Sequence, residues 1–108
     1  MVMREWRGRV PADKAVEYLE FLKTSGFKDY AATPGNLAVY GFQRTEDAVT
    51  EIVLVTLWDS VEAIKRFAGE DYERAHYYPE DQDFLLEFEP FVRHYEVVHR
   101  AVANGALL

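Results

Sequence analysis

The clearest pattern along the chain is an apolar stretch with strand character at residues 49–58. It is rich in valine, isoleucine and threonine, which fit a pleated surface. Alternate side chains of a strand face opposite ways, and here both sets are apolar: Ile52, Leu54, Thr56 and Trp58 on one face, and Val53, Val55 and Leu57 on the other. A strand with one wet face would alternate with polar residues. The pattern therefore predicts a strand that is covered on both sides.

Three further segments carry strand-like patterns and are expected to join this strand in one sheet. They cover residues 2–10, 36–44 and 91–100. The segment at 36–44 is followed by a short polar loop at 45–48, and the strand at 49–58 comes next. This arrangement predicts a hairpin.

Apolar residues recur at steps of three and four in two other segments, which predicts two main helices. The first covers residues 11–25 and stops before Gly26. The second begins with Asp59 as its N-cap. Two shorter helical pieces are predicted after it, at residues 70–77 and 80–89.

The order strand, helix, strand, strand, helix, strand predicts an α+β domain of the ferredoxin-like type, βαββαβ, over residues 1–100. Right-handed crossovers place both helices on one face of a four-stranded antiparallel sheet. The other face is also apolar, and no element is left to bury it. We therefore expect a homodimer that packs through the sheet face. The alternative is a monomer whose open face binds another protein. Residues 101–108 form a C-terminal tail that frays or crosses to a partner.

Composition excludes several classes of protein. The chain has 108 residues, which suits one domain, and no cysteine, so disulfides and thiolate chemistry are excluded. No apolar run is long enough to cross a membrane, and no signal peptide is recognisable, so a cytoplasmic location is expected. The net charge of −7 makes nucleic acid an unfavourable partner.

Aromatic residues are frequent, with seven tyrosines, seven phenylalanines and two tryptophans. Two interpretations remain open: a small core filled with large side chains, or an aromatic pocket between sheet and helices that binds a small hydrophobic or aromatic molecule. The residues expected to line such a pocket are Trp6, Tyr40, Trp58, Phe67, Tyr72 and Phe91.

His76 is the most interesting titratable residue, because it follows the inward stripe of the second helix beside several tyrosines. A neutral imidazole there would accept a proton from a bound phenol. The alternative is a hydrogen-bonded histidine at a helix end. His94 and His99 are five residues apart on a strand, so they face opposite ways and do not form a joint metal site. No phosphate-binding loop is present, and neither a nucleotide cofactor nor a metal is expected.

At this point the chain resembles the antibiotic biosynthesis monooxygenase-like family of dimeric α+β barrels, over residues 2–98. The resemblance rests on the element order and on short matches: Trp58-Asp59-Ser60 followed by Ala63 and Phe67, then His76, and His94-Tyr95-Glu96-Val97. It implies cofactor-independent oxidation of a small aromatic or quinol-type substrate. His76 would be the catalytic base, and Arg93 or Arg4, whichever faces inward, would stabilise the substrate anion.

The haem-degrading branch of the same barrel has an asparagine in the first strand, a tryptophan in the second helix and a histidine after it. His76 stands at the histidine position, which leaves haem binding open. Trp6 and Phe67 stand where the asparagine and the tryptophan are expected, so the resemblance disfavours haem degradation. The competing interpretation of the whole chain is a non-catalytic dimer that binds a small ligand or serves as a scaffold.

Overall fold

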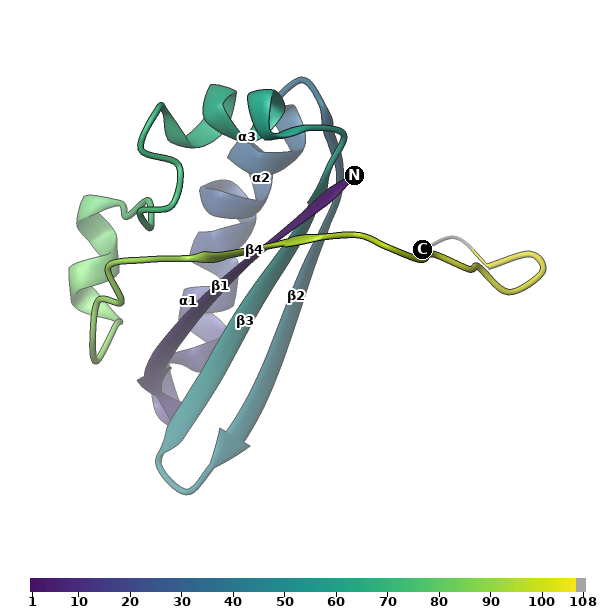
Figure 1. The fold of residues 1–108 in the computed structure, drawn as a ribbon. Helices are drawn as coiled ribbons and strands as arrows, with labels where there is room; N and C mark the ends of the chain where they lie inside the picture. Colours follow the sequence, from purple (N-terminus) through teal and green to yellow (C-terminus); the bar gives the residue numbers. More distant parts are fainter. Residues whose placement is uncertain (107–108) are drawn as a thin grey trace.

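The computed structural model describes residues 1–106 and contains one four-stranded antiparallel sheet (Figure 1). The strands are β1 (Val2–Pro11), β2 (Asn36–Glu46), β3 (Val49–Trp58) and β4 (Arg93–Glu96), in the order β2-β3-β1-β4. This order places the two central strands, β1 and β3, side by side over their whole length. The predicted ferredoxin-like α+β fold is confirmed.

Three α-helices lie on one side of the sheet (Figure 1). They are α1 (Ala15–Thr24), α2 (Gly26–Ala32) and α3 (Val61–Ala68), and two short 3-10 helices, η1 (Ala12–Lys14) and η2 (Pro79–Asp83), accompany them. No helix in the described part of the chain is long and apolar enough to cross a membrane.

The core lies between these helices and the inner face of β1 and β3. Its largest fully buried apolar side chain is Trp58, whose indole Nε1 donates a hydrogen bond to Thr56 Oγ1 at 2.8 Å. The face of β3 that carries Ile52, Leu54, Thr56 and Trp58 is therefore the inward one, and the hydroxyl of Thr56 satisfies the one polar atom of the tryptophan. The apolar core residues are Trp6, Val10, Ala15, Tyr18, Leu22, Tyr30, Ile52, Leu54, Trp58, Ala63, Ile64, Leu85 and Val92.

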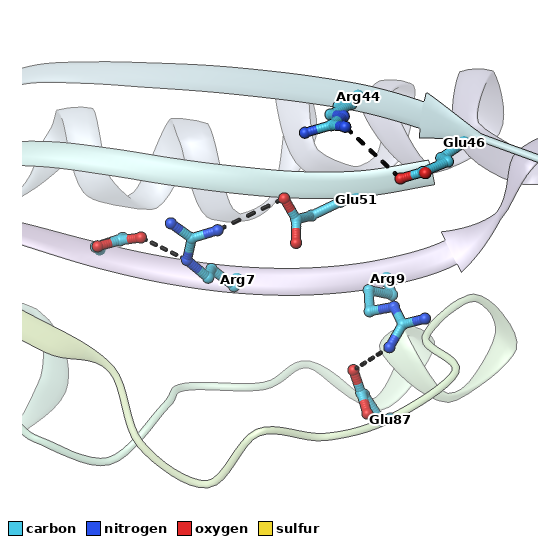
Figure 2. A network of polar contacts seen from close by, with 7 residues as sticks. Arg7, Arg9, Arg44, Glu46, Glu51 and Glu87 are labelled. Atoms are coloured by element: carbon cyan, nitrogen blue, oxygen red, sulfur yellow. Dashed lines mark hydrogen bonds and ion pairs between the residues drawn. The ribbon is translucent and has the colours of Figure 1, made fainter. Parts of the chain in front are cut away.

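The outer face of the sheet has no cover within the described residues. Directly paired residues point to the same side, and the register places Ala38, Tyr40, Phe42, Val53, Val55, Leu57, Met3 and Tyr95 on this face. Towards the β2–β3 hairpin the same face becomes charged, with ion pairs from Arg7 to Glu51 and from Arg44 to Glu46 (Figure 2). The outer face thus has an apolar part and a charged part.

Several predicted boundaries shift because of pairing that the sequence does not display. Pro11 pairs with Val49, so it is the last residue of β1 rather than the first of a helix. The predicted first helix ends one residue early, at Thr24, and Gly26 begins a second helix, α2, instead of only ending the first. The N-cap of α3 is Ser60 rather than Asp59, because the Ser60 hydroxyl accepts a hydrogen bond from the Ala63 amide at 3.2 Å.

The predicted helical piece at 70–77 is wrong. Helix α3 ends at Gly69, which has φ +85°, and the chain beyond it pairs with the segment that leads into β4. The Ala75 amide donates to the Pro90 carbonyl, and the Val92 amide donates to the Glu73 carbonyl. These long-range bonds replace the local bonds of a helix.

Two further predictions on the C-terminal part are corrected. The helix expected at 80–89 is only η2 (Pro79–Asp83), and the strand expected at 91–100 is only β4. Strand β4 pairs with β1 from Glu5 to Val2, and one further hydrogen bond runs from the Val97 amide to the Met1 carbonyl. From there the chain leaves the body of the molecule (Figure 1). The last two residues of the predicted tail lie outside the described residues.

The close packing of Trp6 against Gly8 generates a first prediction. A Cβ atom on Gly8 would lie 2.2 Å from the Trp6 ring, which is buried in the core, so one of the two would have to shift. We expect Gly8→Ala to lower the free energy of unfolding by about 1–3 kcal/mol, measured by urea denaturation. Gly26→Ala is the matched control, because its Cβ would meet only an ordinary contact at 3.7 Å. Equal stability of the two variants would contradict this account of the core.

Candidate functional site

A small pocket opens between the sheet and the helices, above the centre of β1 and β3. Its volume is about 20 Å³, which holds about one water molecule. It is lined by Trp6, Tyr18, Leu22, Gly26, Tyr30, Leu54, Phe67, His76, Tyr78 and Asp81. The walls are mostly aromatic, and the polar groups gather on the side of residues 76–81.

His76 lies at the mouth of this pocket and is exposed to solvent. Its imidazole makes edge-to-face contacts with Phe67 and Tyr78, with ring centroids 5.3 and 5.1 Å apart. The hydroxyl of Tyr78 donates a hydrogen bond to the carboxylate of Asp29 on α2. Tyr78 therefore links the chain after α3 to α2 across one side of the pocket.

Asp81 brings a buried carboxylate to the same pocket. Its Oδ1 accepts a hydrogen bond from the Tyr18 hydroxyl at 2.9 Å, and its Oδ2 accepts one from the Tyr78 amide at 2.7 Å. Burial raises the pKa of Asp81, while these hydrogen bonds and the nearby His76 oppose the rise. Burial and the neighbouring carboxylate also raise the pKa of Tyr18. The pocket thus contains a carboxylate, a phenol and an imidazole in one neighbourhood.

Sequence reasoning missed Asp81 and Tyr18 as members of the site. Tyr18 stands in the apolar helical pattern of residues 11–25, and Asp81 stands among other acidic residues in the segment 80–89. The only local signal is that Asp81 stands two residues after Pro79, where a carboxylate caps the turn by accepting from the Tyr78 amide. Nothing local indicates that Tyr18, which lies 63 residues earlier in the chain, is its partner.

A second polar cluster lies next to the pocket, around Arg4 on the inner face of β1. Arg4 is only 1% exposed. Its Nη1 donates to the Tyr72 carbonyl at 2.5 Å and lies 3.1 Å from His94 Nε2, and its Nη2 donates to the Arg74 carbonyl at 3.3 Å. Burial and then the charge of Arg4 lower the pKa of His94 to about 4. His94 is therefore neutral at physiological pH and accepts the hydrogen bond from Arg4.

The structure brings together some of the residues expected in a pocket. Trp6, Phe67 and His76 line it, and Trp58 is completely buried behind Phe67 and Tyr30. Tyr72 does not line the pocket, and its ring packs against His94 beside Arg4.

Three other predicted residues lie away from the pocket. Tyr40 and Arg93 are on the outer face of the sheet, and Arg93 is exposed. Phe91 is 58% exposed and is covered in part by the guanidinium of Arg74. Of the two arginines considered for anion stabilisation, Arg4 is the one that faces inward. Among residues 1–106, no group of three or more acidic or histidine side chains is placed to hold a metal ion.

Comparison with known proteins finds likeness at the level of the fold. No protein-family model matches the chain, and no curated protein matches it by sequence. Among solved structures, a protein from Nitrosomonas europaea assigned as an antibiotic biosynthesis monooxygenase is 18% identical, with a TM-score of 0.61 over 92% of this chain and 100% of that chain. A point variant of MhuD with two manganese protoporphyrin IX molecules bound per active site is 20% identical, with a TM-score of 0.63 over 94% of this chain and 99% of that chain.

The buried contact between Arg4 and His94 generates a prediction about pH. Because the pKa of His94 falls from its ordinary 6.5 to about 4 on folding, the folded chain binds fewer protons than the unfolded chain between these values. This histidine therefore makes the protein less stable as the pH falls from 6.5 towards 4. We expect a smaller decrease in melting temperature over this range for His94→Gln than for the unmodified protein. His99→Gln, at an exposed histidine, is the control and should behave like the unmodified protein.

Proposed function

We propose that this chain, which shares its fold with an assigned antibiotic biosynthesis monooxygenase, is itself a monooxygenase of the antibiotic biosynthesis monooxygenase-like family. Its substrate would be a small phenol or quinol, oxidised without a cofactor. The observation that carries this proposal is the position of His76 at the mouth of an aromatic pocket between sheet and helices, near the buried carboxylate of Asp81.

His76 is suited to act as the base on a ligand in this pocket. Its imidazole is accessible to solvent, so a proton taken from the ligand can be passed to water. Asp81 places a buried carboxylate on the same pocket, close enough for the charge of His76 to oppose the rise in the pKa of Asp81. Trp6 and Phe67 provide flat apolar walls against which an aromatic ring packs.

The proposed reaction balances without any further reductant. The base removes the phenolic proton, and the electron-rich anion reacts with dioxygen at a ring-activated carbon. One oxygen atom enters the substrate as a carbonyl at a ring carbon that carried a hydrogen, so that the phenol becomes a quinone, and the other leaves as water with the ring hydrogen and the phenolic proton. The substrate supplies all the electrons that reduce dioxygen, and the protein contributes binding, proton transfer and stabilisation of the anion.

The pocket must widen before it holds such a substrate. Its volume is about 20 Å³, whereas a cavity that binds benzene measures about 150 Å³. To widen the pocket, contacts of the irregular segment after α3 would have to break, above all the hydrogen bond from Tyr78 to Asp29. The small volume also favours a second candidate function, a non-catalytic dimer of the same fold that binds a smaller ligand or serves as a scaffold.

Haem degradation is not part of the proposal. The related MhuD structure holds manganese protoporphyrin, but here the side chains of Trp6, Tyr30 and Phe67 occupy the space between sheet and helices. Tyr30 and Phe67 stack with ring centroids 4.2 Å apart, which leaves no slot for a macrocycle. The residues present therefore do not fit a porphyrin, and no step is assigned to one.

The proposed working form is a homodimer that packs through the outer face of the sheet. Burying the apolar part of this face removes it from water, at about 25 cal/mol per Å². Val98 in the segment after β4 is 87% exposed, and this segment extends away from the body of its own chain (Figure 1). In a dimer it would lie against the second copy.

The role of His76 generates a prediction about turnover. His76→Ala should lower the rate of dioxygen consumption with a phenol or quinol substrate by roughly 10²-fold or more, because general base catalysis contributes that much. The rate is measured with an oxygen electrode over a panel of small phenols, quinols and anthrones. His99→Ala is the matched control, and its rate should be unchanged. Turnover that survives in His76→Ala would exclude His76 as the base, and no turnover of any panel member by the unmodified protein would favour the non-catalytic candidate.

The predicted interface has its own measurement. Analytical ultracentrifugation should report a dimer for the unmodified protein and a monomer for Val55→Glu, which places a charge in the apolar part of the outer face. Val16→Glu is the control, because Val16 on α1 is 77% exposed on the opposite side of the molecule. A monomeric unmodified protein, or a dimeric Val55→Glu protein, would contradict this interface.

A further inference from the structure

Arg4 is a buried positive charge whose partners are all neutral. Its guanidinium is permanently charged and only 1% exposed. It donates to two backbone carbonyls, those of Tyr72 and Arg74, and it contacts the neutral imidazole of His94. The Nε donor is also buried, and it has no hydrogen-bond partner within the part of the chain that the structure describes.

A charge in this state is unusual, because buried charges are paired or reach a counter-ion. Every ion pair found among residues 1–106 involves other side chains, and no carboxylate lies within 4.0 Å of the Arg4 guanidinium. The chain has more acidic than basic residues, yet none of the acidic side chains that the structure describes pairs with the buried Arg4. Arg4 is therefore ready to compensate a negative charge that the chain itself does not supply.

The geometry connects Arg4 to the pocket through two aromatic residues. Its guanidinium lies 5.8 Å from the centroid of the Phe67 ring, and Phe67 stacks on Tyr30. Both rings line the pocket. Burial raises the pKa of Tyr30, and the charge of Arg4 opposes the rise, so the Tyr30 hydroxyl stays protonated and lies within the field of Arg4. A hydroxyl of this kind is a hydrogen-bond donor whose negative acceptor would be stabilised by the cation behind it.

We propose that Tyr30 and Arg4 form an anion subsite of the pocket, and that the ligand is an aromatic molecule held there as its phenolate once His76 has taken the phenolic proton. The phenolate oxygen accepts a hydrogen bond from the Tyr30 hydroxyl, and Arg4 supplies the compensating charge. The aromatic ring of the ligand packs on Phe67 and Trp6. This inference rests on the proposed function, and it adds the charge of the ligand and the residues that select it.

The same arrangement assigns a part to His94. His94 is 3.1 Å from Arg4 Nη1, and it is held neutral there. A carboxylate at this position would have neutralised Arg4 and removed its effect on a ligand. A neutral imidazole orients the guanidinium and leaves its charge available. His94 is therefore a positioning residue of the subsite.

The test compares an anionic aromatic probe with a neutral probe, in which a methyl group on the same oxygen removes the charge. Isothermal titration calorimetry at a pH that ionises 4-nitrophenol measures the dissociation constants of 4-nitrophenolate and of its neutral methyl ether, 4-nitroanisole. We expect the unmodified protein to bind the phenolate at least tenfold more tightly than the ether. We also expect the absorbance titration of bound 4-nitrophenol to be displaced to lower pH by about one unit or more, because a nearby cation favours the phenolate.

Three variants assign the effect to residues. Arg4→Met keeps the length of the buried side chain and should abolish the preference for the phenolate while binding of the ether is retained. Tyr30→Phe removes only a hydroxyl and should reduce the preference as well. Arg66→Met is the matched control, because Arg66 also donates to a backbone carbonyl, that of Pro34, but lies on the exposed side of α3. Circular dichroism checks that each variant is folded, and Tyr30→Phe decides the matter if Arg4→Met is not.

Each outcome separates the inference from the function on which it rests. Equal binding of the two probes, or a preference that survives both Arg4→Met and Tyr30→Phe, would overturn the anion subsite and leave the aromatic pocket in place. Binding of neither probe would overturn the pocket and the subsite together. Equally tight binding of 4-nitrobenzoate would show that the subsite selects any anionic oxygen rather than a phenolate, and would overturn that part of the assignment.

Discussion

The register between β1 and β3 decides which side chains reach the interior of this protein. Antiparallel pairing places Trp6 opposite Leu54 and Arg4 opposite Thr56, and all four lie on the helix side. One residue of slippage would exchange the two faces of β1 and bring Glu5 inside in place of Arg4. The apolar core, the aromatic wall of the pocket and the buried cation all follow from this one register. The outer face consists of the strand residues that the same register turns away from the helices.

The irregular segment between α3 and η2 gains its shape from the sheet rather than from its own periodicity. Arg4 donates hydrogen bonds to the carbonyls of Tyr72 and Arg74, and the amide of Ala75 donates one to the carbonyl of Pro90. These contacts place His76 at the mouth of the pocket. The cation of β1 therefore has two consequences at once: it orders the segment that carries the proposed base, and it brings a positive field close to the pocket. A helix at 70–77 would have kept these carbonyls for its own hydrogen bonds.

The site could be predicted from the sequence only in part, and the residues show why. Trp6, Phe67 and His76 lie at inward positions of strongly periodic segments or directly after one, so their meeting in a pocket was predictable. Tyr40 alternates on a strand with two apolar faces, and periodicity alone does not say which face is covered by helices. Asp81 was missed because its partner, Tyr18, is distant in sequence. The directions in which Arg93 and Phe91 point depend on the register of β4. This strand is four residues long and carries little periodic signal.

The sequence by itself determined the order of the elements, the strand at 49–58 with its two apolar faces, and hence the fold class. These features depend on hydrogen bonds and side-chain alternation over a few neighbouring residues, so a short stretch of sequence is enough to predict them. Only the tertiary structure decided that Arg4 rather than Arg93 points inward, that residues 70–77 form no helix, and that Asp81 meets Tyr18 beside His76. Each of these depends on a bond between segments far apart in the chain, whose geometry exists only once β1 has paired with both β3 and β4.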